Sequence, residues 1–202
     1  VLSNSINIIL LTSDVTYTSL SGYTSINIGI FTLTINLSSN EIYTETITGS
    51  GSITKIGSAT LTLSGNNTYT GQTNINAGTL AVTVNNALGT NAAGTVIASG
   101  ATLDLQNVTY STTEAITNNG GTLSTSTGTS SFAGVMTLGA NSTIDVDGTQ
   151  LTVSTAIGDG SNGYDVDKTG NGILVLSGTN SYTGNTTISA GTIKLTGSVN
   201  AL

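Results

Sequence analysis

Two stretches of this chain repeat each other at a fixed distance of 113 residues. Lys55 aligns with Lys168, and the register continues without a gap to Val82 and Leu195. Fifteen of these 28 aligned positions are identical, including glycines, leucines and a tyrosine in the same order. A gapless repeat of this kind predicts two copies of one structural module, because each copy has to place the same corners and core residues.

A shorter recurrence of about 20 residues runs underneath, marked by a Thr-Leu or Thr-Ile pair or its equivalent. Successive marked residues are 19, 23, 20, 21, 30 and 19 positions apart. This period predicts a solenoid, in which each coil buries its apolar side chains only against its neighbours. We interpret the 30-residue interval as a coil with a loop protruding at residues 158–167. The marked residues are Leu61, Leu80, Leu103, Leu123, Ile144, Leu174 and Ile193.

The coils are expected to consist of strands and turns. Apolar and polar residues alternate strictly in Thr60-Leu61-Thr62-Leu63, which indicates a strand with one inward face. A leucine-rich repeat has a similar period, but it would show leucine clusters and often a helical return. Thr, Val and Ile are abundant, whereas only 6% of residues are charged and helix-forming side chains are rare. Because 37% of residues are hydrophobic, a disordered Gly/Ser/Thr-rich linker is disfavoured.

Glycine and asparagine mark the corners between these strands, as in Gly65-Asn66-Asn67 and Asn119-Gly120-Gly121. With roughly 22 residues per coil, the chain would make about nine coils stacked about 4.8 Å apart. One continuous core should run through them on parallel strands, with Gly78 and Gly191 in equivalent turns. The expected core residues are Leu61, Leu63, Ile75, Leu80, Leu103, Leu105, Leu123, Ile144, Leu174, Leu176, Ile188 and Ile193.

Residues 57–80 and 170–193 closely resemble the passenger-associated repeat, or autotransporter-associated β-strand repeat, of autotransporter passenger domains. The resemblance rests on ordered motifs. The first copy has Leu63-Ser64-Gly65, Tyr69-Thr70-Gly71 and Ala77-Gly78-Thr79, and the second has Leu176-Ser177-Gly178, Tyr182-Thr183-Gly184 and Ala190-Gly191-Thr192. It implies an all-β fold, a right-handed parallel β-helix, on a protein secreted across the outer membrane of a Gram-negative bacterium and displayed extracellularly on the cell surface.

The resemblance also shapes the expected domain organisation. We expect one continuous β-helix segment over residues 1–202, with repeat copies at 50–82 and 163–195. Asn86-Ala87-Leu88 follows the first repeat and recurs as Asn200-Ala201-Leu202 with one added residue. We therefore expect the chain to be an excerpt of a longer passenger, cut within a module.

Composition excludes several functions. The net charge is −7, with three Lys and no Arg, so binding to a nucleic-acid backbone is not expected. No apolar run approaches the roughly 18 residues needed to span a bilayer. The chain has neither His nor Cys, which excludes a Ser-His-Asp or Cys-His centre and the usual zinc sites.

Carboxylates are the remaining catalytic option. Asp145 and Asp147 lie two apart on one expected strand and would share a face, and Asp165 and Asp167 repeat the arrangement. The resemblance of such pairs to those of β-helical polysaccharide lyases and glycosidases suggests glycan cleavage as an alternative function. We interpret them instead as solvated outward positions or turn-forming residues that flank Gly148 and Gly163, so we assign no catalytic residue.

Calcium is a further possibility. Residues 162–166, Asn-Gly-Tyr-Asp-Val, partly match the nonapeptide that binds calcium in β-roll proteins. A single imperfect copy does not build the site shared between two coils that this motif needs. We assign no metal-binding residue and no cofactor, and a cation at Asp159, Asp165 and Asp167 is the alternative.

Two pairs of matching residues have simple structural interpretations. Tyr69 and Tyr182 are expected to fill equivalent corner pockets with their hydroxyl groups reaching solvent, rather than to form a sugar-stacking platform. Lys55 and Lys168 are expected on the surface, where they would discourage edge pairing.

The leading functional hypothesis is a non-enzymatic stalk or adhesin segment that mediates adhesion or aggregation. Its partners would be host-cell or matrix glycans and proteins, or other bacterial cells. A second hypothesis is the Asp-dependent glycan-cleaving enzyme. A third is a self-assembling extracellular filament, in which copies associate through Thr and Asn ladders on the flanks or ends.

Overall fold

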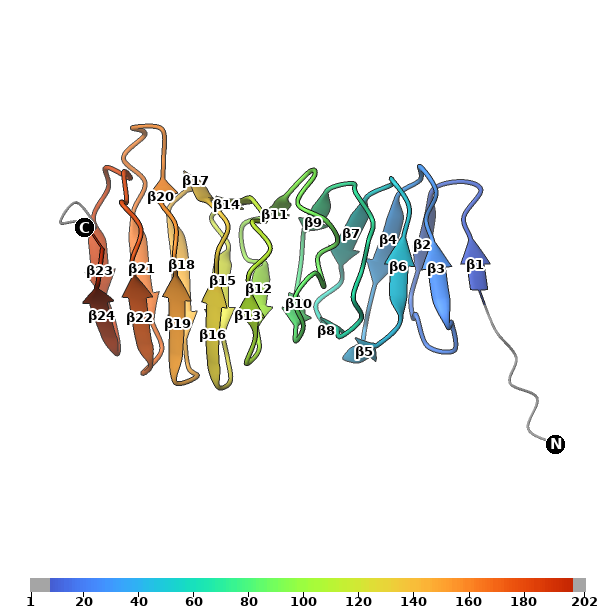
Figure 1. The fold of residues 1–202 in the computed structure, drawn as a ribbon, viewed down its shortest axis with the longest axis horizontal. Helices are drawn as coiled ribbons and strands as arrows, with labels where there is room; N and C mark the ends of the chain where they lie inside the picture. The colour runs from blue at the N-terminus through green and yellow to red at the C-terminus, as the bar shows by residue number, and fades with distance from the viewer. Residues whose placement is uncertain (1–7, 198–202) are drawn as a thin grey trace.

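The chain folds into a rod of stacked coils (Figure 1). The computed structural model describes residues 8–197, and within that range it contains 24 strands and no helix. Every strand pair in this range is parallel. The protein is thus a parallel β-helix of about nine turns, as the repeats predicted.

The strands line three sides of the rod. The first side is an eight-stranded sheet that runs in chain order along the rod. Its strands are β2 (Val15–Tyr17), β4 (Leu33–Asn36), β7 (Ile53–Ile56), β9 (Thr73–Ile75), β11 (Thr95–Ile97), β14 (Ile116–Asn119), β17 (Met136–Ala140) and β20 (Ile157–Gly158).

The second side is another eight-stranded sheet. Its strands are β5 (Glu41–Tyr43), β8 (Thr60–Leu63), β10 (Thr79–Val82), β12 (Thr102–Leu105), β15 (Thr122–Thr125), β18 (Ser142–Val146), β21 (Val166–Thr169) and β23 (Thr186–Ile188). We call its outward surface the β5–β23 flank. It is formed by the side chains that alternate with the core residues on these strands.

The third side holds two shorter sheets. One contains β1 (Ile8–Leu10), β3 (Ser25–Asn27) and β6 (Thr46–Thr48); the other contains β13 (Thr109–Tyr110), β16 (Thr129–Phe132), β19 (Gln150–Val153), β22 (Ile173–Leu176) and β24 (Thr192–Leu195). Irregular arcs lie between the two sheets and continue the stacking from β6. Thr68 N donates to Ile47 O over 3.0 Å, and Thr90 N donates to Tyr69 O over 2.9 Å.

Rows of leucine and isoleucine side chains, stacked from coil to coil, form the core. Leu61, Leu80, Leu103, Leu123 and Ile144 are direct partners on successive strands of the second side. Each row member lies one coil, or about 4.8 Å, from the next. The short sequence period is therefore the length of one coil.

The 30-residue interval has a different explanation from the one predicted. Ile144 pairs with Lys168, whereas Leu174 pairs with Leu151 on the third side. The predicted equivalence of Leu174 and Ile144 is therefore wrong, because the two residues lie in different sheets. The protruding loop is confirmed, since residues 159–165 bulge out between β20 and β21 (top of Figure 1).

The two repeat copies occupy different sides of the rod. In the first copy, β7 and β9 lie on the first side, and β8 and β10 lie on the second. In the second copy, β21 and β23 lie on the second side, and β22 and β24 lie on the third. Each strand of the second copy therefore lies one side further around the rod than its equivalent in the first copy. The reason is that the 113 residues between equivalent positions do not make a whole number of turns.

Most of the predicted core is confirmed. Ten of the twelve residues are buried, but Ile193 is only partly buried and Ile188 is 51% exposed. Ile188 lies on β23, the outermost strand of its sheet, so no strand of residues 8–197 covers its outer side. Asn200-Ala201-Leu202, the recurring triplet, lies outside the described residues.

Gly78 and Gly191 occupy equivalent turns, as predicted. Their φ angles are +66° and +70°, in the left-handed region that favours glycine. A Cβ atom at either position would collide with a carbonyl oxygen of the preceding coil, that of Gly57 or Gly172. Glycine is required here by both the backbone angle and the close approach of the coils.

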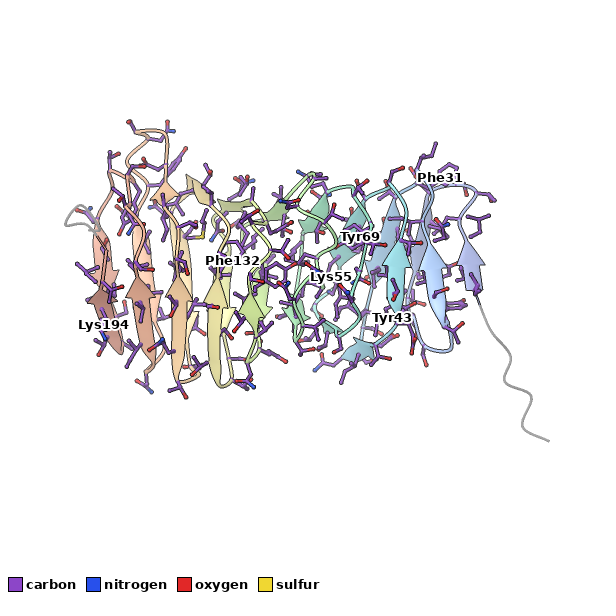
Figure 2. The ribbon with its side chains drawn as sticks, viewed as in Figure 1. Phe31, Tyr43, Lys55, Tyr69, Phe132 and Lys194 are labelled. Carbon is purple, nitrogen blue, oxygen red and sulfur yellow. The ribbon has the colours of Figure 1, made fainter. Side chains whose placement is uncertain are left out.

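Lys55 and Lys168 are fully buried, so their predicted surface position is wrong (Figure 2 labels Lys55). Lys55 lies on β7 between Ile35 and Ile75, in an inward row. Its Nζ donates to Ile56 O and Gly57 O, both over 2.9 Å, and to Ala77 O of the next coil over 3.3 Å. The backbone carbonyl groups replace the water that an exposed ammonium would bind.

Tyr69 and Tyr182 do fill equivalent corners, but their hydroxyl groups do not point freely into solvent. Tyr69 is fully buried, and Tyr182 is 9% exposed. Each hydroxyl lies 2.6 Å from the Oγ1 atom of a threonine four residues later, Thr73 or Thr186. These hydroxyl groups satisfy their hydrogen bonds within the corner, where the prediction had placed water.

Candidate functional site

The β5–β23 flank carries two parallel rows of short polar side chains. Alternation along the strands sets them between the buried core rows, and in-register pairing aligns them across the sheet. One row consists of Thr60, Thr79, Thr102, Thr122, Thr143, Asp167 and Thr187. The other contains Thr62, Ala81, Asp104, Ser124, Asp145 and Thr169.

Hydrogen bonds between coils hold the carboxylates of the second row. Thr169 Oγ1 donates to Asp145 Oδ1 over 2.6 Å, and Ser124 Oγ approaches Asp145 Oδ2 at 3.4 Å. Asp104 accepts from Ser126 N over 2.9 Å and from Ser126 Oγ over 2.6 Å. Each of these carboxylates therefore connects its own coil to the next one by hydrogen bonds.

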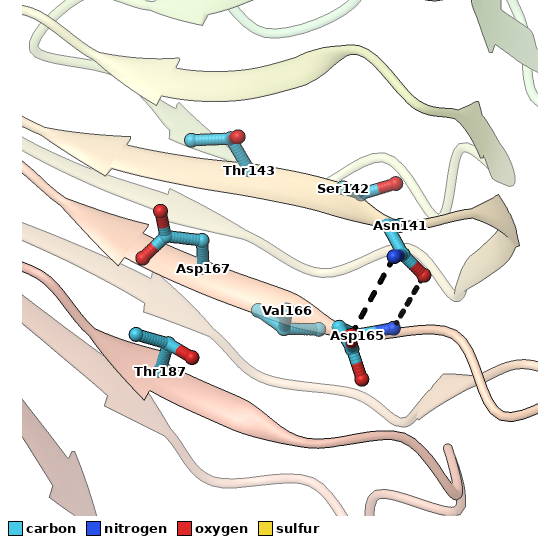
Figure 3. A pocket seen from close by; sticks show the side chains of 7 residues that line it. All are labelled: Asn141, Ser142, Thr143, Asp165, Val166, Asp167 and Thr187. Atoms are coloured by element: carbon cyan, nitrogen blue, oxygen red, sulfur yellow. Dashed lines mark hydrogen bonds between the residues drawn. The ribbon is translucent and has the colours of Figure 1, made fainter.

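A shallow depression lies on this flank where β18 and β21 begin (Figure 3). Its volume is about 280 Å³. Asp165 is fixed at its edge, where Asp165 N donates to Asn141 Oδ1 over 3.0 Å and Asn185 N donates to Asp165 Oδ1 over 2.6 Å. The lining residues are Asn141, Ser142, Thr143, Asp165, Val166, Asp167 and Thr187.

The two predicted aspartate pairs lie on or next to the neighbouring strands β18 and β21, but in different rows. Asp165 and Asp167 both line the depression, although Asp165 precedes β21 and only Asp167 lies within it. Asp145 lies in the other row, and Asp147 is exposed just beyond the end of β18. Burial lowers the pKa of Lys168, and the charges of Asp145, Asp147 and Asp167 all oppose that shift. The depression offers carboxylate, amide and hydroxyl groups suited to contacts with a polar partner.

Asp159 serves the protruding loop. Its carboxylate accepts hydrogen bonds from the backbone N of Ser161, Gly163, Tyr164 and Thr183 at 2.9 to 3.1 Å, and from Thr183 Oγ1 at 3.0 Å. Burial raises the pKa of this carboxyl, but the donors outweigh it and lower the pKa to about 2.

Four donors bond to Asp159 Oδ2 and one to Oδ1, so the protein itself already supplies partners to this carboxylate. Among residues 8–197, no three His, Cys, Asp or Glu side chains gather into a group that could hold a metal ion. The proposed cation ligands Asp159, Asp165 and Asp167 are therefore not brought together.

Sequence reasoning missed one buried acid. Glu114 is 1% exposed, and its Oε1 accepts from Thr95 Oγ1 over 2.8 Å, while Oε2 has no partner among the described residues. Burial raises the pKa of this carboxyl to about 7, against the smaller opposing effect of the Thr95 bond. No motif surrounds Glu114, and only its position between buried strands reveals it.

Comparison with known proteins agrees with this geometry. The passenger-associated-transport-repeat family matches residues 53–82 and 166–195. These are the two copies that the structure places on adjacent sides of the rod. The chain is an autotransporter passenger domain with repeats of this family. Such passengers are secreted to the bacterial cell surface, which gives this one its location.

A curated relative supports the same assignment. The passenger is 38% identical over 141 residues to the adhesin BmaC autotransporter of Brucella suis biovar 1 (strain 1330). The match covers 67% of this chain but only 4% of the relative, so the passenger segment spans a small fraction of that adhesin's length. No solved structure matches it. Residues 8–197 include no helix that is long and apolar enough to cross a membrane.

Proposed function

We propose that this passenger segment is an adhesive, non-catalytic part of a bacterial surface protein, and that the β5–β23 flank is its contact surface. The observation that carries the proposal is the continuity of the flank. A row of six threonines and Asp167 faces outward in register along seven of the eight strands, from β8 to β23. Host-cell or matrix glycans and proteins, or other bacterial cells, are the proposed partners.

The shape and chemistry of the flank favour many weak contacts. Short side chains on paired strands lose little conformational entropy when they are covered, and each presents a donor or acceptor at a fixed spacing. A depression of about 280 Å³ adds one local concavity. The adhesin named above is consistent with this role.

The arrangement of the acids gives no support to the glycan-cleaving alternative. Asp145, Asp159 and Asp165 are each held by hydroxyl or backbone donors. Their hydrogen bonds connect neighbouring coils or order a loop. We therefore propose that these carboxylates have structural and binding roles.

Self-association is a second candidate, favoured by one specific feature. Thr60, Thr79, Thr102, Thr122 and Thr143 form an unbroken threonine row over five strands. A row of this kind can pair with that of a second copy. Sedimentation at increasing concentration separates the candidates, because a monomer that still adheres to cells excludes self-association as the cause of adhesion.

The test of adhesion uses the purified segment coupled to beads. Thr102→Lys with Thr122→Lys places two bulky charges on the flank, and Thr34→Lys with Thr54→Lys is the matched change on the first side of the rod. We expect only the flank variant to reduce bead attachment to host cells, matrix or bacteria. Equal attachment by both variants, with unchanged circular dichroism, would contradict the proposal.

A further inference from the structure

A second depression lies at the β5 end of the β5–β23 flank, outside both matched repeats. The corner of residues 20–24 forms one wall, and residues 42–45, at and after β5, form the other. Leu20 N donates to Glu41 Oε1 over 2.7 Å, which fastens the corner to the next coil. The depression has a volume of about 300 Å³, comparable with small-ligand pockets.

Aromatic and apolar surface is concentrated here. Tyr23 is half-buried, and its ring lies 5.6 Å from that of Tyr17, tilted by 56°. Ile42 is 67% exposed and lies beside the tyrosine in the lining of the depression. Tyr23, Tyr43 and Ile42 thus line one concavity together. The rest of the flank presents threonines and aspartates.

Polar groups lie against this apolar surface. Glu45 is exposed, and its Oε1 accepts from Thr44 Oγ1 over 3.1 Å. Tyr43 is only 3% exposed, and its hydroxyl has no hydrogen-bond partner within the described chain. This hydroxyl has almost no accessible surface, so a ligand in the depression would meet the exposed side chains of Thr44 and Glu45 instead. Burial, and then the charge of Glu45, raise the pKa of Tyr43 to about 12, so this hydroxyl is a donor at neutral pH.

The charges around the depression restrict its ligand. Glu41 and Glu45 border it, and no lysine lines it. Two of the three lysines, Lys55 and Lys168, have their ammonium groups bound to backbone carbonyl groups inside the rod. Lys194 is exposed, but it lies on β24 at the opposite end. An anionic sugar would therefore meet repulsion without a compensating cation.

We propose that this depression binds a neutral pyranose ring of a glycan. The apolar face of the sugar would pack on Tyr23 and Ile42, and its hydroxyl groups would bond to the exposed side chains of Thr44 and Glu45. An aromatic ring beside a few fixed polar groups suits a ligand with one apolar face and a polar rim. This proposal gives the adhesive role a ligand class, neutral sugars. It rests on the proposed function only for the biological purpose of the binding.

The test is saturation-transfer NMR and calorimetry on the purified chain. The probes are methyl glucoside, methyl galactoside and N-acetylglucosamine, with N-acetylneuraminic and glucuronic acids as anionic comparisons. We expect saturable binding of at least one neutral sugar and binding of the acids weaker by about tenfold or more. Absence of saturable neutral-sugar binding, or preference for the acids, would overturn the proposal.

Variants locate the site. We expect Tyr23→Ala to weaken binding by about tenfold or more, as for loss of an aromatic anchor, and Ile42→Ala to weaken it severalfold. Val135→Ala is the matched change, because Val135 is also exposed but lies far along the chain. Glu45→Gln should also weaken binding, and its matched change is Asp147→Asn, at an exposed acid beyond the end of β18. Binding that survives Tyr23→Ala, or that falls equally in the matched variants, would place the site elsewhere.

Tyr43→Phe separates a ligand contact from a structural role. Removing a buried hydroxyl that has no partner should leave the unfolding midpoint unchanged or raise it, and sugar affinity should stay unchanged because the ligand does not reach this atom. A fall in affinity without a change in stability would contradict the proposed position of the sugar at the exposed residues. An apolar peptide that competes with the sugar and binds more tightly would show that the depression is a peptide site instead. Bead adhesion that persists without sugar binding would refute this site alone, whereas sugar binding without adhesion would refute the proposed function alone.

Discussion

Lys55 and Lys168 hold their ammonium groups in the same setting, although they lie on different sides of the rod. Lys168 Nζ donates to Thr169 O, to Gly170 O over 2.8 Å and to Ala190 O over 3.3 Å, matching the three carbonyl groups around Lys55. In each case two of the carbonyl groups belong to the lysine's own coil and one to the next. Each repeat thus carries a buried cation that joins two coils.

Removing either lysine should destabilise the rod. Lys55→Met and Lys168→Met leave buried carbonyl groups without their donor, and we expect each to lower the free energy of unfolding by about 2 to 3 kcal/mol. The two costs should add, because the sites are remote from each other. Urea denaturation measures both, with Lys194→Met as the exposed control. Losses no larger than that of the control would contradict the structural role of the ammonium groups.

Glu114 should make stability depend on pH. Its folded-state pKa of about 7 lies above its ordinary value of 4.5, so its contribution is full below pH 4.5 and is lost as pH rises through 7. One proton changes the free energy of unfolding by no more than about 1.4 kcal/mol per pH unit. Glu114→Gln should flatten this part of the pH profile, measured by urea midpoints between pH 4 and 8. A wild-type profile that the substitution leaves unchanged would contradict the burial of the carboxyl.

Gly78→Ala should cost more than Gly100→Ala. Both glycines have positive φ, +66° and +76°, but a new Cβ collides with the coil below only at Gly78 and meets nothing within 4 Å at Gly100. We expect about 1 kcal/mol for the backbone strain at Gly100 and several kcal/mol at Gly78. Thermal unfolding of the two variants checks this, and equal losses would mean that the coils do not approach as closely as described.

Asp159 should order the protruding loop without a metal. Asp159→Ala removes the acceptor of five hydrogen bonds, and we expect faster proteolytic cleavage within residues 159–165 while the rest of the rod stays intact. Adding a chelator to the wild type should leave the melting temperature unchanged. A chelator-induced fall of several degrees would instead support a cation at this loop.

Local sequence was sufficient for the coil, its strands and its core. The pairing of Leu61, Leu80 and Leu103 could be predicted from the sequence, because stacked coils place similar side chains at equivalent positions. The side of the rod on which each repeat lies could not be predicted. The identical residues around Tyr69 and Tyr182 fold the same way on any side, and the lengths of the coils between them decide the offset. This is why Leu174 aligns with Leu151.

The burial of Lys55, Lys168 and Glu114 was not predicted, for another reason. Charged side chains are as a rule exposed to water, but Lys55 occupies an inward position of β7. Lys55 lies two residues after Ile53 and shares its inward face. The sequence did not show that the carbonyl groups of Ile56, Gly57 and Ala77 would surround its ammonium group. The aspartate rows were visible only as pairs within a strand, because their hydrogen-bonding partners lie on the neighbouring strands.

The adhesive role of the β5–β23 flank is tested most directly by covering one side of the rod at a time. The chain has no Cys, so Thr102→Cys on the flank and Thr54→Cys on the first side each introduce a single labelling site. Attachment of beads is measured before and after coupling a bulky maleimide polymer to each variant. We expect labelling at residue 102 to abolish attachment and labelling at residue 54 to leave it intact. Attachment that survives labelling at residue 102, or is lost equally at both positions, would contradict the assignment of the flank.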